Sequence, residues 1–298
     1  MLSHDLDFVT WRQGQQDAVE RALDRWVRAD APAGLGDAMR YAVLDGGKRL
    51  RPLLVLATCE AVAGHAEAAM RAACAVELIH AYSLVHDDMP CMDNDVLRRG
   101  KPTVHVQFGE AQALLAGDAL QALAFELLVP GDSSVGDAMC ARLCRLLALA
   151  AGADGMAGGQ AVDLASVGVA LDLPSLEAMH RRKTGALLQA SVTMGAASGN
   201  PSPEAQAMLA RYGACVGLAF QVVDDILDVT ADSATLGKTA GKDAAADKPT
   251  FVSLMGLAEA QAYADRVLDQ AHDALRRSGL THTRTLHALA DWVGRRAS

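Results

Sequence analysis

Two aspartate-rich segments carry the side chains best suited to chemistry in this chain. Residues 86–95 read HDDMPCMDND, and residues 221–228 read QVVDDILD. Each segment follows a long apolar stretch that is typical of a buried helix, so both lie at helix C-termini, where the macrodipole disfavours anions. A hard divalent cation would neutralise them, and Mg²⁺ prefers one or two carboxylates completed by substrate phosphates. The sequence therefore predicts magnesium chemistry on a phosphate-bearing substrate.

The spacing within each segment indicates which carboxylates act together. Asp224 and Asp228 are four residues apart, about 40° around a helix, and share one face. Asp87 and Asp93 are six residues apart, about 240° on an ideal helix, and cannot share a face while the helix continues. Pro90 predicts that the helix ends, because proline disfavours helical conformation in the residue before it, and Asp93 can then fold back beside Asp87. One such segment alone could be an acidic helix end exposed to solvent. Two matching segments on two apolar helices favour metal binding instead.

Clusters of basic residues supply the opposite charge. Residues 46–52 read GGKRLRP, in which a Gly-Gly turn next to a helix N-terminus forms a candidate anion pocket. His80 lies seven residues before Asp87, about 20° off its line, and so faces the same way. Together with the carboxylates, these cations describe sites for two highly charged anions, one held through metal and one held directly by Arg and Lys. Three more basic clusters are residues 98–103 (RRGKPT), 181–185 (RRKTG) and 238–243 (KTAGKD), with Lys248 nearby.

The elements that must position these residues are predicted to be helices. Of the 298 residues, 51% are hydrophobic but only 4% are aromatic, and small, unbranched residues favour helices over strands. Apolar residues recur with a helical period, without convincing period-two alternation. We expect an all-α fold, a single-domain bundle of about ten or more helices around a deep central cavity, over residues 1–298. The expected helices cover residues 14–29, 34–46, 52–64, 67–89, 104–128, 136–151, 174–197, 204–229, 249–279 and 282–295.

Charge and cysteine content narrow the class of protein further. The 27 basic and 36 acidic side chains give a net charge of −9, which argues against general nucleic-acid binding. The six cysteines form no CxxC pair and are interpreted as reduced core thiols. The N-terminus does not resemble a signal peptide, and no run of about 18 apolar residues predicts a membrane span. We therefore expect a cytoplasmic protein with no stable membrane insertion.

The ordered set of motifs resembles the short-chain trans-prenyltransferases, most closely the bacterial farnesyl diphosphate synthases. The resemblance extends over residues 35–256, through GGKRLRP, ELIHAYSLVHDDMPCMDND with LRRGKPT, GMAGGQAVDL, KTGAL, GLAFQVVDDILDVT and LGKTAGKD. It implies a Mg²⁺-dependent enzyme, with about three ions when substrate is bound. Such an enzyme joins isopentenyl diphosphate to dimethylallyl or geranyl diphosphate, makes farnesyl diphosphate and releases pyrophosphate. Homodimers are common in this family.

The resemblance also implies roles for individual residues. The Mg²⁺ ligands would be Asp87, Asp88, Asp93, Asp224 and Asp228, with Asp225 in the same catalytic group. Residues matching the positions that hold isopentenyl diphosphate are Lys48, Arg51, His80 and Arg99. Those matching the surroundings of the allylic diphosphate are Arg98, Lys183, Thr184, Gln221, Lys238 and Lys248, of which Lys183 and Lys238 also assist departure of pyrophosphate. Open at this point are the roles of Gln160 and Asp163 and whether Arg295 and Arg296 close over the site.

Two residues before the first aspartate segment bear on product length. Tyr82 and Ser83 precede Asp87 by five and four residues, about 6–7.5 Å along a helix axis. A prenyl tail hanging from a diphosphate at Asp87 would run down this helix. The resemblance implies that an aromatic residue at the fifth position stops growth near fifteen carbons, although Tyr82 could also be ordinary core. The alternatives for function are a geranylgeranyl or longer-chain synthase, a class I terpene cyclase and a non-enzymatic helical scaffold.

Overall fold

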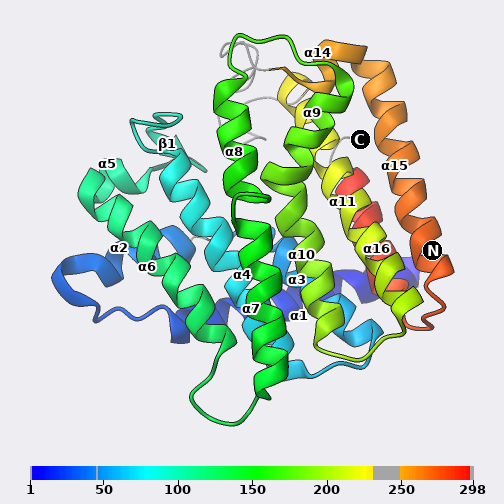
Figure 1. Ribbon diagram of the computed structural model, residues 1–298, viewed down its shortest axis with the longest axis horizontal. Helices are drawn as coiled ribbons and strands as arrows, with labels where there is room; N and C mark the ends of the chain where they lie inside the picture. Colours follow the sequence, from blue (N-terminus) through cyan, green and yellow to red (C-terminus); the bar gives the residue numbers. More distant parts are fainter. Residues whose placement is uncertain (1, 45, 231–248, 296–298) are drawn as a thin grey trace. The chain divides into compact units, whose positions relative to one another are not determined.

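Most of the described structure is helical. The computed structural model describes residues 2–44, 46–230 and 249–295 (Figure 1). Within these ranges the strands form one antiparallel hairpin, β1 (Leu97–Arg98) with β2 (Lys101–Pro102). The all-α fold class is therefore confirmed.

The chain divides into two compact units, each built from two stretches of sequence. Unit 1 consists of Met1–Leu56 and His65–Cys144, and unit 2 consists of Ala57–Gly64 and Arg145–Ser298. The single domain expected over residues 1–298 stays a prediction.

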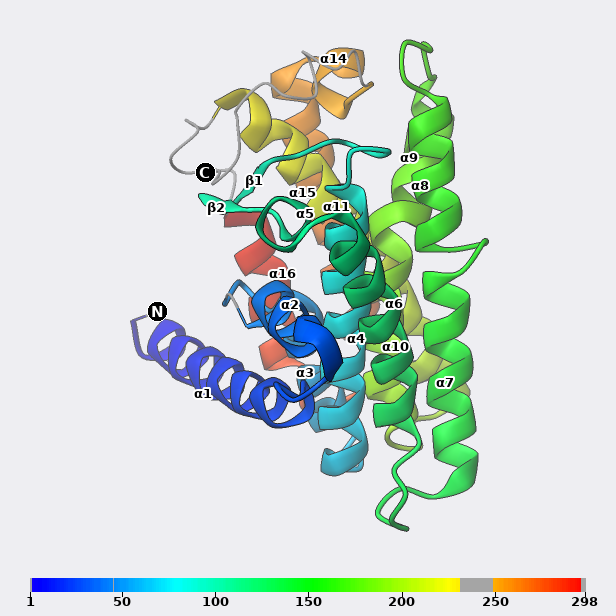
Figure 2. The same cartoon turned by 90° about the vertical axis from the view of Figure 1, so that its left-hand side faces the viewer.

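The centre of unit 1 is α4 (Ala66–Asp87), the first of the two apolar helices. Every residue from Ala72 to Ile79 is buried, as expected for a helix that is apolar on all sides. It lies alongside α6 (Glu110–Leu128) (Figure 2), where a Cβ at Gly117 would lie 2.0 Å from the His86 ring. The other elements of unit 1 are α1 (Leu2–Trp26), η1 (Pro32–Gly34), α2 (Leu35–Val43) and α5 (Val104–Phe108), and two further helices, α3 (Leu50–Ala61) and α7 (Asp137–Ala151), have residues in both units.

Two of the described helices, α4 and α6, are long and apolar enough to cross a membrane, judged by length and composition alone. In α4, 72% of the apolar window is buried inside the protein, as in the core helix of a globular domain. In α6 the buried share is 39%, and Leu114 and Leu115 are 47% and 53% exposed. Core helices of this length pass the same test, so the expected absence of membrane insertion stays a prediction.

The centre of unit 2 is α11 (Pro203–Thr230), the second apolar helix. It packs against α10 (Ala186–Ala197) and α15 (Leu257–Arg277). The fully buried Tyr212 of α11 donates a 2.7 Å hydrogen bond from its hydroxyl to the carbonyl of Leu286 in the C-terminal helix. The other elements are α8 (Met156–Ala165), α9 (Leu173–His180), the π turn η2 (Arg181–Gly185), α14 (Phe251–Met255) and α16 (Arg284–Gly294).

Two glycines break helices that the sequence predicts to be continuous. Gly109, with φ 88°, separates α5 from α6 inside the range 104–128. Gly256, with φ 81°, separates α14 from α15 inside the range 249–279. Glycine adopts positive φ without a Cβ penalty, and helical periodicity on both sides hides the break from sequence reading.

Other elements also differ from the prediction. The expected helix over 174–197 contains the π turn, and α1 begins at residue 2 rather than 14. The stretch over 156–165 forms a helix although it lies outside the periodic ranges. The hairpin has two residues in each strand, too few to show alternation in the sequence.

Candidate functional site

The first aspartate segment folds back on itself directly after α4. The helix ends at Asp87, and the backbone N–H of Asp93 donates a 2.9 Å hydrogen bond to the Asp87 carbonyl. The N–H of Asp95 donates to the Asp88 carbonyl over 3.1 Å. This is the return predicted from Pro90. It brings Asp93 beside Asp87, with both residues half-buried.

Asp88 is held by a guanidinium. Arg98 donates from Nε and Nη2 to the two carboxylate oxygens at 2.8 and 2.6 Å, and Asp88 is 3% exposed. Burial alone would lower the pKa of Arg98, but the hydrogen bond and charge of Asp88 outweigh burial and raise that pKa. A bidentate pair is strong and directional, so it ties β1 to the end of α4. The expected roles of Asp88 as Mg²⁺ ligand and Arg98 as diphosphate contact stay predictions.

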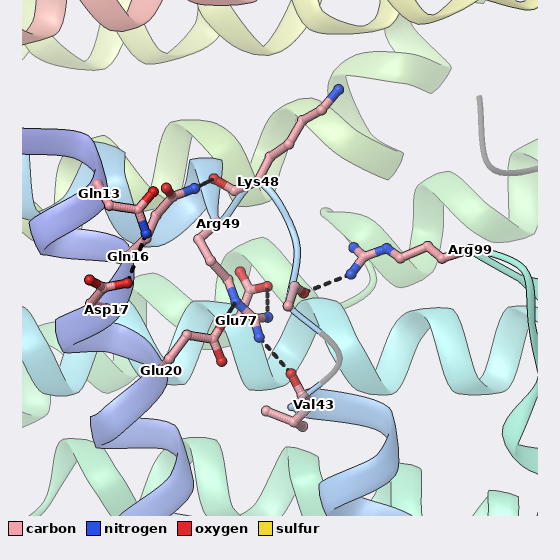
Figure 3. Close-up of polar contacts among 10 residues, drawn as sticks. Gln13, Gln16, Asp17, Glu20, Val43, Lys48, Arg49, Glu77 and Arg99 are labelled. Atoms are coloured by element: carbon pink, nitrogen blue, oxygen red, sulfur yellow. Dashed lines mark hydrogen bonds and ion pairs between the residues drawn. The ribbon is translucent and has the colours of Figure 1, made fainter. Parts of the chain in front are cut away.

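The GGKRLRP turn is fastened through its backbone. The Gly46 carbonyl accepts a 2.7 Å hydrogen bond from Arg99, and the Lys48 carbonyl accepts one of 3.0 Å from Gln16 (Figure 3). Gly47 has φ 130°, and a Cβ there would lie 2.8 Å from the Arg99 guanidinium. Only glycine therefore lets Arg99 lie against the turn in this conformation.

Arg49, in the middle of the same turn, points inward. It is 5% exposed and donates to Glu20 at 2.7 Å, to Glu77 at 2.6 Å and to the Val43 carbonyl at 2.6 Å. Burial alone would lower the pKa of Arg49, but the charges and hydrogen bonds of Glu77 and Glu20 raise it, so the guanidinium stays charged. The Lys48 side chain extends away from this cluster (Figure 3). Arg49 thus fixes the turn from inside the protein, whereas the Lys48 side chain takes no part in this cluster.

A pocket in unit 1 gathers residues predicted to hold an anion. His80, Arg98 and Arg99 are in its wall. Burial lowers the pKa of His80 well below its usual value, and the positive charges of Arg51, Arg98, Arg99 and Arg49 lower it further. His80 is therefore neutral near pH 7 and lies among guanidinium groups. Such a composition suits a multiply charged anion, and the binding of one here stays a prediction.

In unit 2, the second aspartate segment forms the last turns of α11. Gln221 and Asp224 are half-buried, whereas Asp228 is 5% exposed. Asp225 accepts a 2.8 Å hydrogen bond at Oδ2 from the backbone N–H of Phe251. Asp225 therefore ties the start of α14 to α11, a role that the sequence does not reveal. Its expected catalytic role stays a prediction.

The π turn carries two more of the predicted residues, Lys183 and the half-buried Thr184. Lys183 Nζ donates a 2.6 Å hydrogen bond to Asp163 of α8, which is 5% exposed. Asp163 is one of the residues whose role the sequence leaves open. Lys238 and Lys248 lie outside the described residues.

Oxygen ligands for a hard cation are present in both units. In the part of the chain that the structure describes, no three His, Cys, Asp or Glu side chains already form a metal site. Mg²⁺ does not require such a group, because it binds through one or two carboxylates, water and substrate phosphates. Half-buried Asp87 and Asp93 in unit 1 and Asp224 in unit 2 fit that requirement. Asp88 and Asp225 fit it less well, because a guanidinium and a backbone N–H occupy their oxygens.

A family comparison decides between the enzyme classes that such a site could serve. The family profile described as "Polyprenyl synthetase" matches residues 32–282. The chain belongs to the polyprenyl synthetase family.

Relatives of this polyprenyl synthetase match most of its length. "Geranylgeranyl pyrophosphate synthase 7, chloroplastic" of Arabidopsis thaliana is 47% identical over 99% of this chain and 86% of its own. "Probable farnesyl diphosphate synthase" of Bradyrhizobium diazoefficiens is 52% identical over 89% of this chain and 81% of its own. A solved geranyltransferase from Helicobacter pylori, complexed with magnesium and isoprenyl diphosphate, has a TM-score of 0.86 and 34% identity, with coverage of 97% of this chain and 98% of that one. The protein is a prenyltransferase, which sets aside the cyclase and scaffold alternatives.

The two residues that bear on product length differ in what they contact. The Tyr82 ring meets the His86 ring edge-on at 5.7 Å. Burial raises the pKa of Tyr82, and a hydrogen bond to Gln121 of α6 lowers it in part. Ser83 donates a 2.8 Å hydrogen bond back to the His80 carbonyl of its own helix. In the polyprenyl synthetase, Tyr82 therefore places its bulk toward α6, whereas Ser83 adds little volume.

Replacing Arg49 with Met should destabilise the polyprenyl synthetase by about 3–5 kcal/mol, because Glu77 would be left as a buried charge without its cation. Urea unfolding followed by circular dichroism measures this change. The matched control is Arg28→Met, since Arg28 pairs with Asp30 at 2.8 Å but both side chains are more than 70% exposed. The control should cost less than about 1 kcal/mol. Equal effects of the two substitutions would contradict the structural role of Arg49.

His80 should make stability depend on pH in a defined direction. Its pKa is lowered in the folded state, so below pH ~6.5 the unfolded chain takes up a proton that the native ring does not, and stability falls as pH falls. His80→Gln removes this effect. Between pH 7 and pH 5.5 the variant should lose about 1 kcal/mol less unfolding free energy than the wild type. Parallel urea titrations at both pH values test this, and identical losses would show that His80 titrates normally.

Proposed function

We propose that this prenyltransferase condenses isopentenyl diphosphate with dimethylallyl diphosphate and then with geranyl diphosphate, forming farnesyl diphosphate and releasing pyrophosphate in each step. The observation that carries the proposal is the pocket of unit 1, whose wall holds neutral His80 together with Arg98 and Arg99. A site of this composition suits a diphosphate that is bound throughout the reaction and does not need a metal. The names of the bacterial relatives support the farnesyl product.

Mg²⁺ fits the residues that the chain presents. Asp87 and Asp93 would hold it in unit 1, and Asp224 would hold it in unit 2, with Asp228 as a further ligand. When bound, Mg²⁺ withdraws electrons from the allylic diphosphate and stabilises the departing pyrophosphate. We propose about three ions with substrate bound, as the family resemblance implies.

The chain's own residues then bind and orient the two substrates. Lys48, Arg51, His80 and Arg99 hold isopentenyl diphosphate, whose double bond attacks the allylic carbon as pyrophosphate leaves. Thr184, Gln221 and the ammonium of Lys183 contact the allylic substrate, with Lys238 and Lys248 as further expected contacts. After the new C–C bond forms, a proton leaves the product. In this proposal the departing pyrophosphate accepts the proton. The two carboxylates in the described wall of the basic pocket, Glu77 and Asp88, are each ion-paired with an arginine and are therefore poor bases.

The second candidate product is geranylgeranyl diphosphate. The plant relatives favour it, since they carry that name and match at 47% identity. Tyr82 favours the shorter product, because its ring is bulky and lies between α4 and α6, five residues before Asp87. We therefore keep farnesyl diphosphate as the main proposal.

We further propose a cytoplasmic homodimer. The exposed leucines 114 and 115 of α6 support an interface with a second copy, because a helix with a large apolar surface is stabilised by a partner. Light scattering of the purified protein tests the dimer, and cell fractionation tests the location.

The proposed function is tested by incubating the protein with Mg²⁺, isopentenyl diphosphate and either dimethylallyl or geranyl diphosphate, and by identifying products by mass. Farnesyl diphosphate is expected from both allylic substrates. Asp87→Ala should lower turnover at least about 10³-fold, because a metal ligand contributes several kcal/mol to the transition state. Asp269→Ala, which removes an exposed carboxylate of α15, is the control and should leave turnover unchanged. Full turnover by Asp87→Ala would contradict its assignment as a ligand.

Product length should respond to the residues before the aspartates. Tyr82→Ala removes the proposed floor of the prenyl pocket, so products should lengthen to about twenty carbons or more. Ser83→Phe adds bulk one residue closer to Asp87, so products should shorten toward ten. Chromatography of the reaction products measures both. Unchanged farnesyl product from both variants would show that the floor lies elsewhere.

A further inference from the structure

The GMAGGQAVDL stretch has no role in the proposed function, yet it makes close contact with the π turn. This stretch is α8, and its Asp163 accepts a 2.6 Å hydrogen bond from Lys183 Nζ. The Asp163 side chain is 7% exposed, whereas that of Lys183 is 25% exposed. The carboxylate is therefore buried behind the ammonium, which keeps partial access to solvent.

The backbone of α8 is built to approach the π turn. A Cβ added at Gly159 would lie 2.1 Å from the backbone nitrogen of Lys183 and 2.5 Å from its Cα. Only a residue without a side chain leaves room for this approach, and Asp163 follows one helical turn later on the same side. A π turn widens a helix locally and is frequent at functional sites. The close backbone packing and the ion pair thus both come from α8, and both act on Lys183.

Two buried polar side chains of α8 and α9 carry no charge. Gln160 is 9% exposed and His180 is 8% exposed, and neither side chain has a hydrogen-bond partner in the described part of the chain. Burial lowers the pKa of His180 to about 4, with Asp163 opposing and Lys183 adding to that shift, so the ring is neutral near pH 7. Of Gln160, Asp163 and His180, Asp163 is therefore the one that carries a charge opposite to that of Lys183.

We propose that Asp163 is a positioning residue for Lys183: it holds the ammonium in place so that its remaining N–H groups meet the diphosphate that leaves during prenyl transfer. The inference rests on the proposed function, because that function assigns Lys183 to the allylic diphosphate. A lysine side chain has four rotatable bonds, so an unsupported ammonium would sample many positions. A buried carboxylate at 2.6 Å restricts it to one, which is the support that a catalytic group requires.

The first measurement separates turnover from substrate binding. Asp163→Asn keeps the size of the side chain but removes its charge. It should lower kcat at least about tenfold, in the range seen when supporting residues of an active site are removed. The KM for isopentenyl diphosphate, which the basic pocket of unit 1 binds, should stay within about twofold. Asp154→Asn is the matched control, because Asp154 is an exposed aspartate just before α8, and it should match the wild type in both constants.

The second measurement asks whether Asp163 acts through Lys183. In a double-mutant cycle, Asp163→Asn introduced into a Lys183→Met background should lower kcat by less than about twofold, since the group that it positions is already gone. If Asp163 only stabilised the fold, its effect would be the same in both backgrounds, and the inference would be overturned. Asp163→Glu, which keeps the charge, should retain more activity than Asp163→Asn, and circular dichroism checks that each variant is folded.

The proposed function and this inference fail in different ways. A wild-type protein that forms no prenyl product from these diphosphates contradicts the proposed function. An active wild type with an equally active Asp163→Asn variant contradicts the positioning role alone.

Discussion

A guanidinium withdrawn into unit 1 is the interaction on which the architecture of the basic pocket depends. Arg49 reaches Glu20 of α1, Glu77 of α4 and the carbonyl of Val43 at the end of α2, so one side chain joins three helices to the GGKRLRP turn. An arginine can do this because its planar group presents donors in several fixed directions at once. The negative charges of Glu20 and Glu77 offset the cost of burying the Arg49 guanidinium, and they do so only while both carboxylates are present.

Buried acids also hold two of the cations that are expected to bind substrate. Arg98 is paired with Asp88 beside the first aspartate segment, and Lys183 is paired with Asp163 beside the π turn. In each case a carboxylate less than 8% exposed holds a cation that is more exposed. Buried acids therefore define where these two cations lie. Without the buried carboxylate, each of these side chains would sample more rotamers, and its charged group would not keep one position.

The sequence predicts the helical framework well because its strongest signals are local. The apolar runs that become α4 and α11 are long and continuous. Pro90 predicts the end of α4, after which the chain brings Asp93 back beside Asp87. The breaks at Gly109 and Gly256 are not predicted, since a glycine inside a helical pattern does not disclose its φ.

The site is predicted less completely because pairing is a property of three dimensions. Nothing in GGKRLRP distinguishes the inward Arg49 from Lys48, which extends away from it (Figure 3). The partners of Arg98 and Lys183 are 10 and 20 residues away in sequence. Asp225 reads as one more carboxylate of its cluster, although it accepts a hydrogen bond from Phe251, 26 residues later. Residue types thus predict the kind of chemistry. The fold decides which charged side chains are paired within the protein and which can take part in that chemistry.

The bidentate contact of Arg98 with Asp88 has a consequence for how the two substrates influence each other. Asp88 adjoins Asp87, a proposed metal ligand, and Arg98 adjoins Arg99, a contact of the basic pocket. The pair joins the end of α4 to the hairpin, so a ligand that reoriented one of the two residues would change the free energy of binding at the other. Thermodynamic linkage makes this effect reciprocal. In the proposed function, any factor by which a metal-bound diphosphate beside Asp87 changes the affinity of the basic pocket for isopentenyl diphosphate would apply equally in the other direction.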